Sequence, residues 1–129
     1  MNKDLRQVEA LVDLINEYVS TEKTIESLPC GYISEKTISG HTYCYRQWRE
    51  GAKIVSCYVP NPLLNSVKRK IALRKENVAL LKEVNRDYLK VARKVVKAGL
   101  LTDKDLDDLF NAARNGEDIS DLAEAKIRK

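Results

Sequence analysis

The sequence predicts an α+β fold that is mainly α, with a long antiparallel helix pair, a three-stranded antiparallel β-meander and two short C-terminal helices. This fold is predicted by two patterns of apolar residues along the chain. Apolar residues recur every three or four positions over residues 3–19 and again over 61–98, which is the spacing of one helix face. Residues 32–59 alternate with period two and are rich in β-branched and aromatic side chains. Because 129 residues is the length of one domain, we expect a single domain over residues 1–129.

The first helix is expected over residues 1–28. Its apolar residues recur at alternating steps of three and four, which keeps them on one stripe. The helix ends where Leu28-Pro29-Cys30-Gly31 removes a backbone donor and adds a flexible residue. The stripe consists of Leu5, Val8, Val12, Ile15 and Val19.

The meander is expected over residues 31–59. Glycine-bearing turns at Ser39-Gly40 and Glu50-Gly51 separate three period-two segments, and each turn suits a two-residue loop. The strands are then about 32–38, 41–49 and 52–59. Such loops pair Thr42 with Thr37, Tyr43 with Tyr58, and Cys44 with Cys57.

The alternation also assigns the strand residues to two faces. One face consists of Tyr32, Lys36, Ile38, Tyr43, Tyr45, Gln47, Ile54 and Tyr58. The other consists of Ile33, Glu35, Cys44, Arg46, Trp48, Lys53, Val55 and Cys57. Because the first face has fewer charges and more aromatic bulk, we expect it to be the buried one. A one-residue slip in either turn would exchange the faces of a strand.

A long basic helix is expected over residues 61–98, beginning at Asn61-Pro62 and stopped by Gly99. At about 1.5 Å per residue its length is roughly 55 Å, so it is longer than the first helix. Its unmatched apolar seam favours a homodimer, unless the acidic helical tail over residues 99–129 covers it. In that tail, Thr102 and Asp105 have the spacing of a capping box.

The net charge of +4 is unevenly distributed along the chain. Residues 61–98 carry eleven basic and three acidic side chains, and residues 29–60 have a net charge of +2. Residues 1–28 and 99–129 each have a net charge of −3. A strongly basic middle between two acidic ends favours an anionic partner, nucleic acid first. The alternative is that the acidic N-terminal segment packs along the basic helix and neutralises it.

Several classes of function are not supported by the residues. The sequence has no apolar run long enough for a membrane span and no apolar signal-peptide core, so we expect a cytoplasmic protein without membrane contact. The single histidine, His41, lies in a turn, and the three cysteines lack metal-ligand spacing. The acidic residues from Asp103 to Asp108 are better explained as stabilising a helix N-terminus than as ligands of a metal ion. We therefore expect no catalysis, no cofactor, no metal and no small-molecule substrate.

Two basic groups are the candidate binding residues. Arg46, Trp48 and Lys53 share a strand face, with Arg49 beside the turn. An exposed aromatic ring flanked by cations can stack on a base while the cations meet phosphates. The second group lies at the start of the long helix and consists of Lys68, Arg69, Lys70, Arg74 and Lys75. The alternative is that Trp48 packs over a helix end and the basic side chains are only solvated.

The segment LPCGYISEKTISGHTYCYRQWREGAKIVSCYV, followed by a basic helix, resembles a group of small uncharacterised bacterial and phage proteins. These have a leading helix, a Leu-Pro-x-Gly entry and a meander reading K-x-I-x-G-x-x-Y-x-Y…EG-x-K…Y-[VI]. The resemblance covers about residues 5–97 and implies a helix pair capped by a meander, without catalytic residues. The sheet also resembles, more loosely, the three-stranded DNA-binding modules of some phage integrases, which lack this leading helix and very long following helix.

Three hypotheses of function follow. The first is a non-enzymatic protein that binds nucleic acid through the basic β-face and the basic helix. The second is a phage-encoded anti-defence inhibitor, of the anti-CRISPR type, that binds a nucleoprotein complex. The third is a structural coiled-coil protein that forms a homodimer along residues 61–98.

Overall fold

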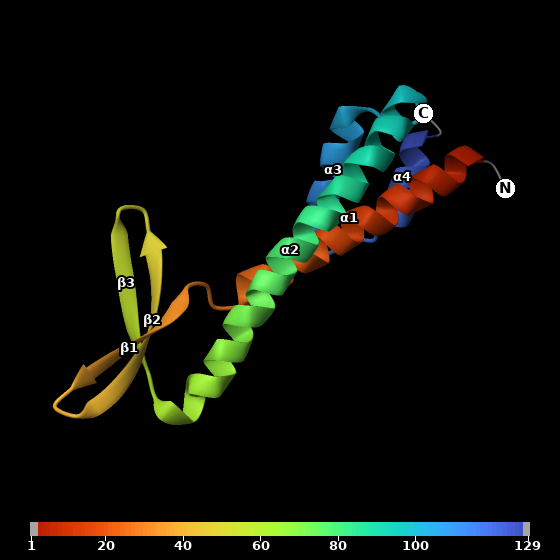
Figure 1. Cartoon of the computed structure of the whole chain (residues 1–129). Helices are drawn as coiled ribbons and strands as arrows, with labels where there is room; N and C mark the ends of the chain where they lie inside the picture. Colours follow the sequence, from red (N-terminus) through yellow and green to blue (C-terminus); the bar gives the residue numbers. More distant parts are fainter. Residues whose placement is uncertain (1–2, 128–129) are drawn as a thin grey trace. The chain divides into compact units, whose positions relative to one another are not determined.

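The computed structural model describes residues 3–127 (Figure 1). The predicted α+β, mainly α fold is confirmed, and the first helix, the three strands and the long helix lie within a few residues of their expected bounds. Residues 1–2 of the expected first helix and 128–129 of the expected tail lie outside the described residues. In the described part of the chain, no helix is both long and apolar enough to cross a membrane. The elements are α1 (Lys3–Ser27), β1 (Tyr32–Ile38), β2 (His41–Glu50), β3 (Lys53–Val59), α2 (Asn61–Lys97), α3 (Asp103–Arg114) and α4 (Ile119–Ile127).

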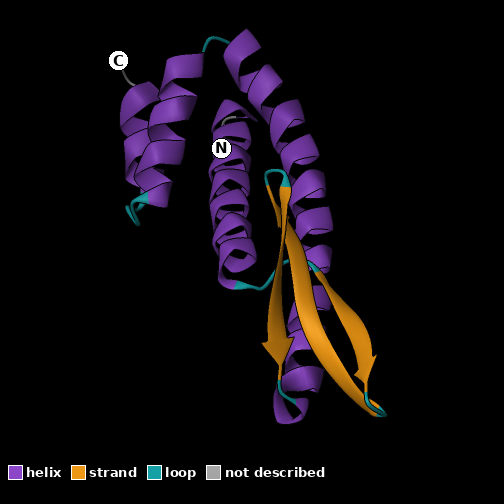
Figure 2. Ribbon diagram, turned by 90° about the vertical axis from the view of Figure 1, so that its left-hand side faces the viewer, coloured by secondary structure: helices purple, strands orange, loops and turns teal. Residues whose placement is uncertain are grey.

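The chain forms two compact units. The helical unit comprises Met1–Lys23 and Ala79–Lys129, and the sheet unit comprises Thr24–Val78. Both α1 and α2 therefore contribute to each unit. The apolar core lies in the helical unit, where α1 runs antiparallel to the adjoining part of α2 (Figure 2). Its buried residues are Val8, Leu11, Val12, Ile15, Val19, Tyr88, Ala92, Val95, Leu101, Leu106, Leu109, Ala112, Ala113, Ile119 and Ala123.

The acidic tail covers the C-terminal part of the α2 seam. Tyr88 and Val95 of α2 belong to the same buried cluster as Leu106 and Leu109 of α3. Val84 is also buried. The seam that led us to expect a homodimer is thus covered within the chain at this end, because α3 and α4 supply the missing apolar partners. At the N-terminal end of the predicted apolar stripe in α1, Leu5 is exposed, whereas the other residues of the stripe are buried.

The helix boundaries follow from the capping residues that the sequence predicted. Thr102 and Asp105 form a reciprocal capping box, with hydrogen bonds of 3.1 Å and 2.9 Å between side chain and backbone. At the end of α2, Gly99 has a φ of 75°. There the Leu100 N–H donates to the Val95 carbonyl at 3.1 Å, the bond that closes a left-handed helix terminus.

The three strands form an antiparallel sheet in the order β1-β2-β3. The first predicted register is confirmed, since Thr42 lies opposite Thr37. The second is wrong by two residues, because Gly51 and Ala52, not Glu50 and Gly51, form the loop. Glycine at the first loop position suits a tight two-residue turn, and Gly51 has a φ of 59° there.

The corrected register pairs Tyr58 with Tyr45, in place of the predicted Tyr43, and pairs Cys57 with Arg46, in place of the predicted Cys44. Side chains alternate with period two, so a shift of two residues leaves every side chain on its predicted face. The tyrosine face comprises Tyr32, Ser34, Lys36, Ile38, His41, Tyr43, Tyr45, Gln47, Arg49, Ile54, Ser56 and Tyr58. The tryptophan face comprises Ile33, Glu35, Thr37, Thr42, Cys44, Arg46, Trp48, Glu50, Lys53, Val55, Cys57 and Val59.

The expectation that the tyrosine face is buried is wrong. The buried strand residues, Cys44 and Val59, lie on the tryptophan face. On the tyrosine face, by contrast, Tyr32 is 52% exposed and Tyr58 is 50% exposed. The charge of Arg46 led to the wrong expectation: its guanidinium donates to the Cys30 carbonyl at 2.7 Å, which ties the tryptophan face to the loop that enters the sheet.

Candidate nucleic-acid interface

The predicted cation–aromatic group on the tryptophan face contacts other parts of the sheet unit. The Arg46 guanidinium lies 3.9 Å from the centre of the Trp48 ring. The Trp48 Nε1 donates to Glu50 Oε1 at 3.0 Å. Arg46 therefore covers one ring face, and its own charge is shared between that ring and the Cys30 carbonyl. The two contacts of Trp48 lie within β2, and the Arg46–Cys30 hydrogen bond ties β2 to the loop before β1, so the Arg46 guanidinium and one face of the Trp48 ring are already engaged.

The other two predicted strand cations lie on different faces. Arg49 is exposed and lies on the tyrosine face, whereas Lys53 is exposed and lies on the tryptophan face opposite Glu50. The tryptophan face also carries Glu35, so its acidic side chains offset its basic ones. An anionic ligand would meet both signs of charge on this side of the sheet.

Of the five predicted basic residues of α2, one makes hydrogen bonds within the sheet unit and four are exposed. The Arg74 Nη1 donates to the carbonyl oxygens of Ile25 and Leu28, at 2.5 Å and 3.0 Å. Arg74 thus satisfies carbonyls at the end of α1, where a cation is favoured by the helix dipole. The exposed cations are Lys68, Arg69, Lys70 and Lys75. No ion pair among the described residues involves any of these four.

The tyrosine face is the surface that sequence reasoning missed. Tyr45 and Tyr58 have ring centroids 5.8 Å apart, and Tyr43 and Tyr58 have centroids 6.3 Å apart. The Lys36 Nζ lies 5.0 Å from the centre of the Tyr45 ring. An aromatic cluster with an adjacent cation therefore lies on a partly exposed sheet surface.

The charge on this face has one sign. All strand residues are described, and the tyrosine face has Lys36 and Arg49 but no Asp or Glu among them. It also carries His41. We interpreted the low charge and aromatic bulk of this face as signs of burial. The absence of acidic residues is the signal that could have identified it as a surface for an anionic, planar ligand.

The charge difference extends to the whole sheet unit. Thr24–Val78 contains nine basic and four acidic side chains, a net charge of +5. The remaining residues contain fourteen basic and fifteen acidic side chains, a net charge of −1. The local positive field therefore belongs to the unit that carries the exposed tyrosines.

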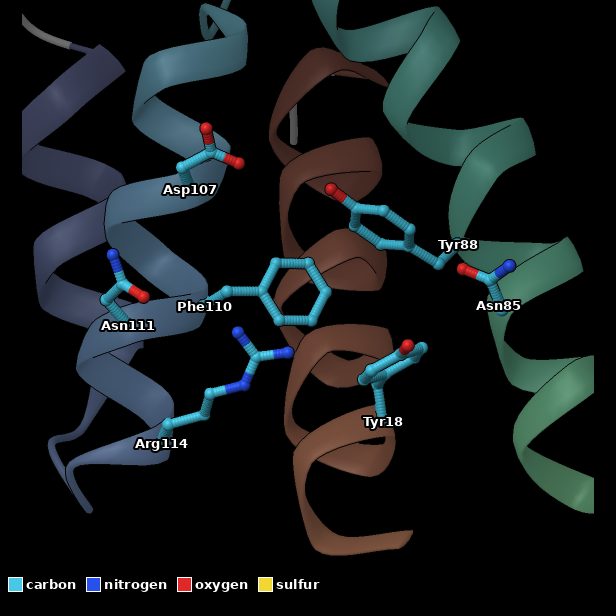
Figure 3. A pocket seen from close by; sticks show the side chains of 7 residues that line it. All are labelled: Tyr18, Asn85, Tyr88, Asp107, Phe110, Asn111 and Arg114. Carbon is cyan, nitrogen blue, oxygen red and sulfur yellow. The ribbon is translucent and has the colours of Figure 1, made fainter. Parts of the chain in front are cut away.

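The helical unit has a cavity of about 440 Å³ beside its aromatic residues (Figure 3). The Phe110 ring packs edge to face with Tyr18 and Tyr88, at centroid distances of 5.3 Å and 5.1 Å. Arg114 lies over Phe110 and pairs with Glu22 at 3.2 Å. The residues lining the cavity are Tyr18, Asn85, Tyr88, Asp107, Phe110, Asn111 and Arg114.

The cavity is lined by aromatic, amide and charged side chains. Burial raises the pKa of the Tyr88 hydroxyl, and the charges of Asp107 and Asp103 raise it further. Tyr88 is therefore a neutral hydrogen-bonding group at neutral pH. The lining residues include no histidine, cysteine, serine or lysine. In the described part of the chain, no cluster of three histidine, cysteine, aspartate or glutamate side chains has the geometry of a metal site.

The remaining sequence candidates lie in both units, His41 and the cysteines in the sheet unit and the acidic residues in the helical unit. His41 is exposed beside the first turn. Cys30, Cys44 and Cys57 are free thiols of unequal exposure, and Cys44 and Cys57 are not paired across the strands. In the acidic segment, Asp105 caps α3 and pairs with Lys126 at 3.6 Å, while Asp108 pairs with the same lysine at 3.2 Å.

Comparison with known proteins identifies a family without a known activity. Neither a curated protein nor a solved structure matches the chain. One family model matches residues 3–69, which comprise α1, the whole sheet and the start of α2. The chain therefore belongs to the family described as Domain of unknown function (DUF6788).

Proposed function

We propose that the protein is a non-enzymatic nucleic-acid-binding protein and that its sheet unit contacts the nucleic acid. One observation carries this proposal. The same compact unit has a net charge of +5, a partly exposed tyrosine face without acidic residues, and four exposed cations in α2 without ion-pair partners among the described residues. A cytoplasmic location in a bacterial host is part of this proposal, because both DNA and RNA are present there.

The predicted binding residues have different roles in this proposal. Lys68, Lys70 and Lys75 are exposed and suit phosphate contacts, as do Arg69 and Arg49. Phosphate contacts by such side chains supply affinity without sequence preference. By contrast, we assign structural roles to Arg46, Trp48 and Arg74, because the side chain of each donates a hydrogen bond within the sheet unit. Lys53 is a peripheral contact.

The proposal is tested by fluorescence anisotropy with labelled oligonucleotides at several salt concentrations. A plot of the logarithm of the affinity against the logarithm of the salt concentration has a negative slope. Each phosphate that the protein neutralises adds about 0.7–0.9 to the size of that slope. The double variant Lys68→Glu/Lys75→Glu is expected to bind at least about 10-fold more weakly and with a smaller salt slope. The matched control is Lys90→Glu/Lys94→Glu, which makes the same charge change on exposed residues of α2 in the helical unit.

The control variant is expected to keep its affinity within about 3-fold, because its charges lie outside the sheet unit. Equal losses for the two double variants would mean that only total charge matters and would overturn the assignment to the sheet unit. An absence of salt-dependent binding by the unmodified protein at micromolar concentrations would overturn the proposed function. A protein that recognises only an assembled nucleoprotein complex would give that result.

A further inference from the structure

We infer that the tyrosine face is a stacking platform for the bases of single-stranded nucleic acid. This inference rests on the proposed function and specifies its ligand. It begins from the position of the rings. Tyr45 and Tyr58 are directly opposite each other on neighbouring strands, and Tyr43 lies two residues along β2 from Tyr45. Tyr32 extends the same face on β1.

The rings have the orientation that leaves aromatic surface for a planar ligand. The planes of Tyr45 and Tyr58 are inclined at 63°, and those of Tyr43 and Tyr58 at 59°. Tyr45 and Tyr58 pack edge to face and Tyr43 and Tyr58 are tilted, so each ring keeps at least one face that the other ring does not cover. Tyr32 and Tyr58 are also half exposed. A nucleobase placed against such a ring gains the stacking contact that the fold does not provide.

The charges around the rings match a nucleic-acid backbone. Lys36 lies over Tyr45, and Arg49 lies on the same face toward the second turn. Since the face has no acidic side chain among the strand residues, a phosphate close to the rings has cations and no carboxylate as neighbours on that face. The combination of aromatic rings and cations is the pattern by which sheet surfaces bind single strands.

The same features argue against two other occupants. In a duplex, the bases stack on each other and present only their edges, so the rings would find no base face. In a symmetric dimer through this face, Lys36 and Arg49 of one copy would approach those of the other without any acidic partner. Like charges brought together in this way oppose association.

The test compares one single-stranded DNA, the same sequence as RNA, and the corresponding DNA duplex, all by anisotropy with the full chain. Tyr45→Ala/Tyr58→Ala is expected to lower the affinity for both single strands at least about 10-fold and to change the affinity for the duplex less than about 3-fold. Tyr45→Phe/Tyr58→Phe keeps the rings and is expected to bind single strands within about 3-fold of the unmodified protein. Ile54→Ala is the control for loss of exposed apolar surface on this face, and it should bind normally.

Circular dichroism on each variant establishes that the fold is retained. If the Tyr→Ala variant binds single strands normally while Lys68→Glu/Lys75→Glu does not, the stacking platform is wrong and the proposed function stands. If the unmodified protein binds no oligonucleotide, both are wrong. If sedimentation finds a dimer that Tyr45→Ala/Tyr58→Ala dissociates, a second copy of the chain covers the face and the inference is overturned.

Discussion

The helical unit and the sheet unit use their apolar residues in opposite ways. In the helical unit, residues from four helices form a continuous buried core that includes Leu11, Ile15 and Leu109. In the sheet unit, the buried apolar residues are Cys44, Val59 and Ile71, and the tyrosines lie at the surface. The helical unit has a net charge of −1 and the sheet unit one of +5.

Under the proposed function, this difference assigns stability mainly to the helical unit and binding to the sheet unit. Apolar burial is the main source of folding free energy, so the helical unit supplies most of it. The sheet unit depends more on strand pairing and on a few directed hydrogen bonds, such as those of Arg46 and Arg74. Aromatic surface that folding leaves exposed is available to a ligand.

The largest expected effect lies in the core of the helical unit. Leu109→Ala removes a fully buried side chain, so we expect the free energy of unfolding to fall by about 2–5 kcal/mol. Urea unfolding followed by circular dichroism measures this loss. Leu122→Ala is the control, since Leu122 is 36% exposed, and its cost should be below about 1.5 kcal/mol. Equal costs would contradict the placement of the core.

The next effect concerns the entry to the sheet unit. Gly31 has a φ of 99°, and a Cβ there would overlap the Gln47 carbonyl oxygen. We expect Gly31→Ala to cost about 3 kcal/mol, from backbone strain and overpacking together. Gly40→Ala is the matched control, because Gly40 also has a positive φ but open space around it. Its cost should be about 1 kcal/mol. Thermal unfolding followed by Trp48 fluorescence distinguishes the two.

A smaller effect on stability is expected at Arg74 of α2. Comparing it with the adjacent Lys75 distinguishes a residue that stabilises the fold from one that we propose contacts nucleic acid. Arg74→Met removes the donor of the Leu28 carbonyl and one of two donors of the Ile25 carbonyl, which keeps the Leu28 N–H at 3.2 Å, so we expect a loss of about 1–2 kcal/mol in stability. Lys75→Met should change stability by no more than about 0.5 kcal/mol, because Lys75 is exposed, and should weaken oligonucleotide binding. Denaturant unfolding and anisotropy on both variants measure the difference. A reversal of the two results would contradict these roles.

The smallest effect depends on pH and lies in α3. The hydrogen bond from the Thr102 backbone, together with Lys126, lowers the pKa of Asp105 in the folded chain. The Asp105 carboxylate therefore binds a proton more tightly in the unfolded chain than in the folded chain. The ionised carboxylate stabilises the fold at neutral pH, and this stabilisation is lost as the pH falls below about 4. Asp105→Asn, which keeps an acceptor oxygen and removes the charge, should cost about 0.5 kcal/mol at pH 7 and almost nothing at pH 3. Unfolding curves at the two pH values test this, and a cost that is independent of pH would contradict it.

Much of the fold was predictable because it depends on local signals. Gly99 and Thr102 end and begin helices through neighbouring backbone groups, and their effects were visible in the sequence. Period-two alternation assigned the strand residues to the correct faces. The loop at Gly51 was less predictable, because a glycine fits either position of a two-residue loop.

The candidate site was less predictable because it depends on contacts between distant segments. Arg74 resembles its basic neighbours in sequence, and only its hydrogen bonds to Ile25 and Leu28 distinguish it. The choice of the buried face depended on Arg46 reaching the Cys30 carbonyl across sixteen residues. In neither case do the residues around the arginine identify the carbonyl that accepts its hydrogen bond.

The most direct test of the central claim is a titration of the ¹⁵N-labelled protein with single-stranded DNA, followed by amide chemical shifts. We predict that the perturbed amides lie in β1–β3 and in the basic part of α2 around Lys68–Lys75. We expect little change in α3 and α4, which form the acidic tail. Perturbations concentrated in α3 and α4, or none at saturating DNA, would contradict the assignment of nucleic-acid binding to the sheet unit.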